Sequence, residues 1–138
     1  MLYIGVTGSR ELRDRDLVLT VLREHSLDRE AFLVVGDQRT QDKITGENYG
    51  ADWIAHDLWT LPSNPNHNNV KVFIADWDRY PKRAGMIRNT EMVRWVLDTA
   101  SPKIWLAFYQ RGAENKGTAH CANYARKHGI EVREHWAA

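Results

Sequence analysis

Short runs of β-branched and aromatic residues alternate along this chain with longer segments in which apolar residues recur every three or four positions. Runs of the first kind predict strands, and recurrence of the second kind predicts helices. We predict strands over 2–7, 31–35, 70–75, 103–108 and 130–133. We predict helices over 16–25, 51–59, 84–100 and 118–128. Strict alternation of the two predicts an α/β fold, a Rossmann-like open, doubly wound parallel sheet of five strands in the order 3-2-1-4-5.

Length and composition fit a single domain over residues 1–138, large enough to fold around a hydrophobic core without disulfide bonds or a structural metal. The lone Cys121 has no internal disulfide partner, which favours a reducing, cytoplasmic location. Because the first residues form a predicted strand, we expect neither a signal peptide nor a membrane anchor. The 19 basic and 18 acidic residues leave a formal net charge of +1, which argues against a nucleic acid as partner.

Doubly wound sheets bind ligands at the carboxyl ends of their strands, where the winding direction reverses. This rule directs attention to the loops after the first and fourth strands. The first loop contains Gly8, Ser9 and Arg10, which offer a close backbone approach, a hydroxyl and a guanidinium to a phosphate. The alternative is a tight strand-to-helix turn with a surface arginine. The fourth loop ends in Gly117 and Thr118 at a helix start, a second cradle for an oxyanion.

The loops after the second and third strands supply further candidates. Gly36 ends the second strand, and the long polar segment 38–49 is a candidate lid. Gly50 brings the backbone close to the crevice, and Asp52 either accepts from a ribose hydroxyl or stabilises a helix start.

The third loop leads through Trp77 into a helix that begins with cationic residues. Trp77 can stack on a base, and Lys82 and Arg83 are either phosphate contacts or solvated surface charges. Arg88 and Asn89 lie in the first helical turns, where a cation gains nothing from the helix dipole, and we expect them to contact a ligand. The six histidines show no metal-ligand spacing, and no catalytic triad follows from spacing, so we expect no metal, no cofactor and no assignable catalytic residue.

These loops together resemble the YspA-like branch of the SLOG superfamily, which is named for the DNA-processing protein Smf/DprA and the Lonely Guy enzymes. The most specific match is the Ala-Gly-x-x-Arg-Asn-x-x-Met run over 84–92, and the others lie at 6–10, 50–52, 75–77 with Tyr80, and 117–118 with 129–132. The resemblance implies a Rossmann-like fold, a nucleotide or nucleotide-derived ligand, and a bacterial or phage origin. The segment 38–49 is longer than the short glycine turn usual in this branch.

Similarity to the Lonely Guy phosphoribohydrolases is partial. Arg88, Glu91 and Met92 match their helix, and Gly117-Thr118 matches part of their glycine-rich loop. His120 stands where those enzymes carry the glutamate that the resemblance implies as catalytic acid. This replacement favours binding over hydrolysis of an N-glycosidic bond.

The sequence therefore predicts binding or sensing of a nucleotide-like phosphorylated molecule, of nucleoside monophosphate or ADP-ribose type. Phosphate is expected at the first and fourth loops, phosphate or ribose at Arg88 and Asn89, and the base on Trp77. The first alternative is a hydrolase that splits base from ribose phosphate with Asp52, Glu91 or His120 as acid or base. The second is a single-stranded DNA-binding module, which the near-neutral charge disfavours. A homo-oligomer is possible, with Trp95, Trp105 and Trp136 as candidates for a dimer face.

Overall fold

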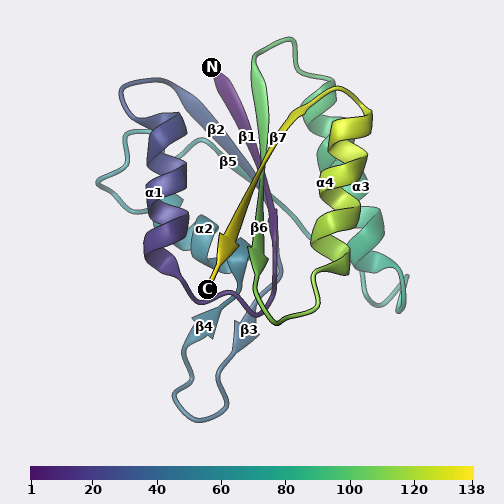
Figure 1. The fold of residues 1–138 in the computed structure, drawn as a ribbon. Coiled ribbons are helices and arrows are strands. Elements are labelled where there is room, and N and C mark those ends of the chain that lie inside the picture. The colour runs from purple at the N-terminus through teal and green to yellow at the C-terminus, as the bar shows by residue number, and fades with distance from the viewer.

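The structure is a computed structural model that describes all residues from 1 to 138. Five strands form one parallel sheet in the order β5-β2-β1-β6-β7 (Figure 1). Their bounds are β1 (Leu2–Gly8), β2 (Ala31–Gly36), β5 (Val70–Phe73), β6 (Lys103–Gln110) and β7 (Glu131–Ala137). The helices are α1 (Arg15–Ser26), α2 (Ala51–Trp59), α3 (Ala84–Leu97) and α4 (Lys116–Lys127). The predicted fold class, strand order and alternation are confirmed.

Most element ends differ from the predicted ones by one or two residues, and two differ by more. β7 continues to Ala137 rather than 133, because it pairs with β6 in register from Ile104↔Glu131 to Gln110↔Ala137. α3 ends at Leu97 rather than 100, where the Thr99 hydroxyl donates to the carbonyl of Val96 and turns the chain.

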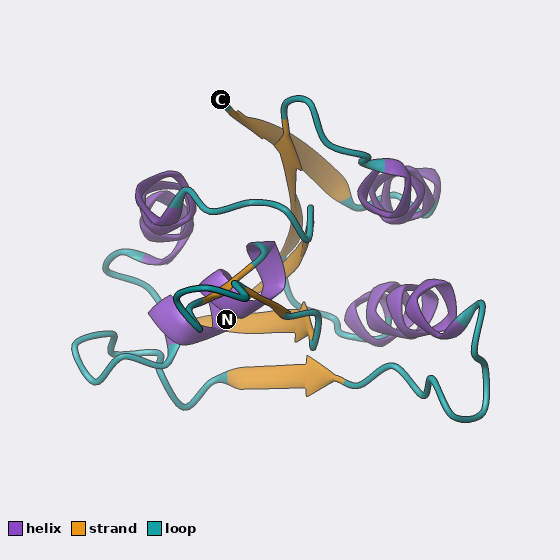
Figure 2. Cartoon of the chain, turned by 90° about the horizontal axis from the view of Figure 1, so that it is seen from below, coloured by secondary structure: helices purple, strands orange, loops and turns teal.

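Helices cover both faces of the sheet, with α1 and α2 on one side and α3 and α4 on the other (Figure 2). Neighbouring residues of a strand therefore enter opposite cores: Leu33 and Val35 pack in the cluster under α1 and α2, and Val34 packs in the cluster under α3 and α4. This two-sided burial explains the continuous apolar runs in the sequence. None of the helices combines the length and hydrophobicity that a membrane crossing requires.

Trp105 cannot contribute to a dimer face, because its side chain is fully buried in the second core. The ring lies flat over Gly5, where an added Cβ would come within 2.2 Å of it. Trp95 packs against Tyr3 and Phe32. Of the three predicted candidates, Trp136 alone is exposed.

The segment 38–49 contains a β-hairpin, whereas the sequence predicted an unstructured lid. Strands β3 (Thr40–Gln41) and β4 (Asn48–Tyr49) pair antiparallel at the end of the molecule where the main strands end (Figure 1). The hairpin is fixed by Arg13, which pairs with Asp42 at 3.1 Å and lies over the ring of Tyr49. Gln38 is the one residue of this segment that lines the cleft described below.

Candidate functional site

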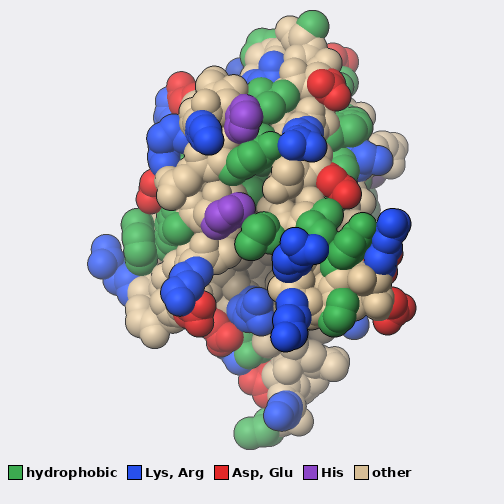
Figure 3. Space-filling model, turned by 90° about the vertical axis from the view of Figure 1, so that its right-hand side faces the viewer, with side chains coloured by type: hydrophobic (Ala, Val, Ile, Leu, Met, Phe, Trp, Pro, Cys, Tyr) green, Lys and Arg blue, Asp and Glu red, His purple; other side chains and the backbone are tan.

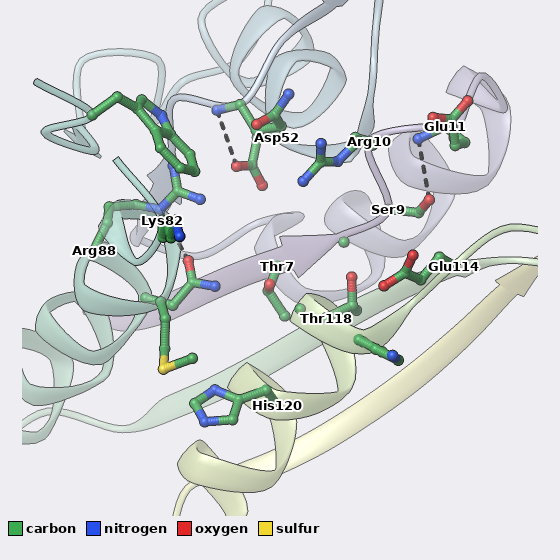
Figure 4. A pocket seen from close by; sticks show the side chains of 18 residues that line it. Thr7, Ser9, Arg10, Glu11, Asp52, Lys82, Arg88, Glu114, Thr118 and His120 are labelled. Carbon is green, nitrogen blue, oxygen red and sulfur yellow. Dashed lines mark hydrogen bonds between the residues drawn. The ribbon is translucent and has the colours of Figure 1, made fainter. Parts of the chain in front are cut away.

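A cleft of about 730 Å³ lies at the carboxyl ends of β1 and β6, between the N-terminal ends of α3 and α4 (Figure 4). Its volume falls in the usual range for small-molecule sites, but Trp77 and Met86 are its only hydrophobic lining residues. Most of the predicted site residues line it: Gly8, Ser9, Arg10, Asp52, Trp77, Arg88, Asn89, Gly117 and Thr118. The polar lining suits a charged, hydroxyl-bearing ligand.

The first loop leaves fewer free amides than the sequence predicted. The Ser9 amide donates to the carbonyl of Phe108 at 2.9 Å and so extends the β1–β6 ladder. The Ser9 hydroxyl oxygen accepts from the amide of Glu11 at 3.1 Å, so its own proton is free to be donated. The Arg10 amide has no protein partner, and the Arg10 side chain is exposed. This loop therefore offers one amide, one hydroxyl and one guanidinium.

The fourth loop presents the uncapped start of α4 to the cleft. The side chain of Asn115 spans the loop, donating to the carbonyls of Gln110 and Ala113, and makes no capping bond. The amides of Lys116, Gly117 and Thr118 consequently have no protein partner, and all three residues line the cleft. An unsatisfied helix start with a lysine in its first turn is an anion-binding arrangement.

Arg88 enters the cleft from α3 as a nearly buried side chain, 8% exposed. Its Nη1 donates to Oδ1 of Asp37 at 2.5 Å, and its Nε donates to Oδ1 of Asn89 at 3.0 Å. Only Nη2 is without a protein partner. Arg88 can therefore give a ligand one directed contact, not the two-pronged contact that a free guanidinium makes.

Gly36, the last residue of β2, leaves room for the side chains of Asp52 and Arg88. A Cβ at residue 36 would lie 2.7 Å from Oδ2 of Asp52 and 2.9 Å from Cζ of Arg88. The absence of a side chain lets the carboxyl and the guanidinium meet over the strand end. Gly36 is not among the residues that line the cleft, and in this structure it leaves room for two residues that are.

Gly50 also lies outside the lining. Its φ of +104° is in the region that favours glycine, and its amide donates to the carbonyl of Leu12 at 2.9 Å. A Cβ at this position would lie 3.2 Å from the carbonyl oxygen of Arg10. Gly50 therefore packs against the backbone of the Arg10 loop.

Asp52 contributes a carboxyl from the first turn of α2 that is 7% exposed. Burial raises its pKa to about 6, although Arg88 and a 3.3 Å hydrogen bond from the amide of Gln38 oppose that rise. Asp37 adds a like charge that raises the pKa further. Because Asp37 already neutralises Arg88, Asp52 lacks a counter-ion of its own, and its carboxyl keeps a proton up to about pH 6.

The rim of the cleft carries exposed charged groups. Lysine and arginine side chains gather toward this end of the face formed by α3 and α4 (Figure 3). Lys82 and Lys116 line the cleft and make no ion pair, and the carboxylates of Glu11 and Glu114 line it as well. His120 also lines it. Glu91 is not among its lining residues.

Sequence reasoning missed several residues of this site. Thr7 is buried near the end of β1 and lines the cleft beside Thr118 (Figure 4). Asp37 holds Arg88 across 51 positions of sequence, and its one signal was its place directly after the second predicted strand. The chain holds no group of three or more His, Cys, Asp or Glu side chains arranged for a metal ion.

Comparison with known proteins identifies a phage protein as a relative. The chain is 37% identical over 135 residues to the Gene 61 protein of Mycobacterium phage D29, covering 96% of this chain and 94% of that protein. The chain belongs to the family of this phage protein. No protein-family model and no solved structure matches the chain. The relative is encoded by a phage, and a bacterial or phage origin was the expectation from the sequence resemblance.

Proposed function

We propose that this member of the Gene 61 protein family binds a nucleotide-derived phosphorylated ligand in the cleft, as a SLOG-type binding or sensing domain of the YspA-like branch. The observation that carries the proposal is the convergence of two anion-binding loops on one cavity. The start of α4 brings three unpartnered amides, and the first loop brings the amide and guanidinium of Arg10. Anions are stabilised by such groups through hydrogen bonds and the helix dipole.

Trp77 supports the nucleoside part of the proposal. Its indole is 48% exposed on the rim of the cleft, and its ring lies 3.6 Å from the position of a Cβ at Gly85. A flat aromatic face held over a glycine at the edge of a polar site is suited to stack on a base. Met86, the other apolar lining residue, follows Gly85 in the first turn of α3.

Calorimetric titration with AMP and ADP-ribose tests the proposal. We expect at least one of them to bind, and we expect Arg10→Ala to weaken binding by about 1.5–3 kcal/mol, the range for hydrogen bonds to charged groups. Arg111→Ala is the matched control, because Arg111 is an exposed arginine that does not line the cleft. Equal affinity of both variants for the bound nucleotide would refute phosphate binding at the first loop.

Hydrolysis of a base–ribose bond is a second candidate, and the raised pKa of Asp52 favours it. A carboxyl that holds a proton to about pH 6 inside a cleft can protonate a departing base. His120 on the α4 side is a second candidate acid or base. Chromatography of free base after incubation with nucleoside monophosphates and NAD tests this function, and release by native protein but not by Asp52→Asn would establish it.

A further inference from the structure

Two separate anion-binding ends face each other across the cleft. The first is the start of α4, where Lys116 and three unpartnered amides line the cavity. Thr118 lies within this end, 5% exposed, and its hydroxyl makes no hydrogen bond to the protein. A buried hydroxyl without a partner that faces a cavity is a group prepared for a ligand.

The second end is the start of α3, on the opposite side of the cleft (Figure 4). This helix also lacks a side-chain cap, and the amides of Gly85 and Met86 have no protein partner. Lys82 adds an unpaired cation, and the nearly buried Arg88 aims its unpartnered Nη2 at the same region. Each end thus joins a lysine to free amides and to a buried polar side chain.

The floor between the two ends has the opposite chemistry. Asp52 and Thr7 occupy it, and Oδ1 of Asp52 has no hydrogen-bond partner. A carboxyl accepts from hydroxyl groups and repels phosphate oxygens. A contiguous diphosphate would place its charge in this middle region, whereas a sugar ring would place hydroxyls there.

We infer that the cleft takes a sugar bearing two phosphates on separate carbons, with one phosphate at the start of α4, the other at the start of α3, and the sugar over Asp52. A nucleoside 3′,5′-bisphosphate has this chemistry. The inference rests on the proposed function and narrows its ligand class.

Two rim carboxylates compete with one of these phosphates. Glu11 and Glu114 are exposed and lie on the side of the cleft where Thr118 lies (Figure 4). Neither forms an ion pair, so both side chains are free to turn to solvent when a phosphate binds. Glu114→Gln removes one competing charge, and we expect it to strengthen bisphosphate binding several-fold.

Calorimetry on the 138-residue protein with adenosine 3′,5′-bisphosphate, AMP and ADP-ribose tests the inference. We expect the bisphosphate to bind about tenfold more tightly than AMP, and Lys82→Ala and Lys116→Ala each to weaken the bisphosphate about tenfold, as loss of one charged contact does. For AMP, one of these two variants should have little effect. Lys127→Ala, in the last turn of α4, is the control and should change nothing.

Three results would overturn the inference while leaving nucleotide binding intact. These are equal affinity for AMP and the bisphosphate, an effect of only one lysine on the bisphosphate, and tighter binding of ADP-ribose than of the bisphosphate. Failure of all three compounds to bind would instead overturn the proposed function itself. Thermal denaturation of each variant shows whether the exchanged lysine changes folding, which we do not expect of exposed side chains.

Discussion

Asp37 holds Arg88 by an ion pair whose Nη1–Oδ1 distance is 2.5 Å, joining the end of β2 to α3. The same Oδ1 accepts from the amide of Ala75 at 3.3 Å and so also fixes the loop after β5. Three segments distant in sequence therefore meet at one carboxylate. The pair cancels the charge of Arg88 but leaves its Nη2 available to the cleft.

Asp37→Asn should destabilise the fold and weaken ligand binding together. Arg88 is nearly buried, and loss of its counter-ion leaves a charge that its surroundings solvate poorly. We expect the free energy of unfolding in urea to fall by about 1–3 kcal/mol. Asp78→Asn changes an exposed aspartate outside the cleft and should leave stability unchanged.

A double-mutant cycle on Asp37 and Arg88 shows whether Asp37 affects ligand affinity by positioning Arg88 or by a general effect on the structure. If Asp37 acts through Arg88, then Asp37→Asn should cost ligand affinity in the native background and have no further effect on affinity in an Arg88→Met background. Additive losses in the double variant would show that Asp37 acts independently of Arg88.

Asp52 should make stability depend on pH. Its pKa is about 6 in the folded chain and near 3.8 in the unfolded chain, so the native state binds the proton more tightly. The stabilisation is complete below about pH 4 and is lost as the pH rises through about 6. The loss amounts to about 3 kcal/mol from the pKa difference.

Urea denaturation of native protein and Asp52→Asn across this pH range measures the effect. The difference in unfolding free energy between the two proteins should shift in favour of the variant as the pH rises, because asparagine does not ionise. A difference that stays constant from pH 4 to 7 would show that Asp52 has an ordinary pKa.

Gly36→Ala should displace the side chains of Asp52 and Arg88 that line the cleft. The added Cβ would come within 2.7 Å of Asp52 and 2.9 Å of Arg88, so both side chains must move. We expect a loss of about 1–3 kcal/mol in stability, as for other overpacked positions, and a loss of nucleotide binding. Gly117→Ala is the control for stability, because no atom lies within 4 Å of the added Cβ. Equal stability of the two variants would contradict the crowding at Gly36.

The sequence predicted the sheet well because burial on both faces leaves a clear pattern. The run Leu33-Val34-Val35 is apolar throughout because its side chains enter two different cores. The hairpin β3–β4 escaped prediction because each of its strands has two residues, too few for a period. Its contacts with Arg13 join residues 29 and 36 positions apart, which no local pattern reveals.

The site was predictable in outline and not in detail. Parallel topology places the loops after β1 and β6 side by side, and Gly8 and Thr118 follow from that rule. The ion pair of Arg88 cannot be predicted from that rule, because its partner Asp37 lies 51 residues away. For the same reason the sequence does not reveal that Gly36 accommodates the side chains of Asp52 and Arg88.

Trp77 should contribute base stacking to nucleotide affinity. Trp77→Ala should weaken binding of the bound nucleotide by about 1–3 kcal/mol, the range measured for stacking on aromatic side chains. Trp136→Ala is the matched control, since Trp136 is 47% exposed but lies outside the cleft. An equal affinity of the two variants in calorimetry would place the base elsewhere.

Mass spectrometry of the small molecules released when the purified protein is denatured tests the central claim most directly. We predict that native protein releases a phosphorylated nucleoside or sugar compound, and that the Arg10→Ala/Lys116→Ala double variant, purified in the same way, does not. Release of no phosphorylated molecule by the native protein, or the same release from the double variant, would contradict phosphate binding in this cleft.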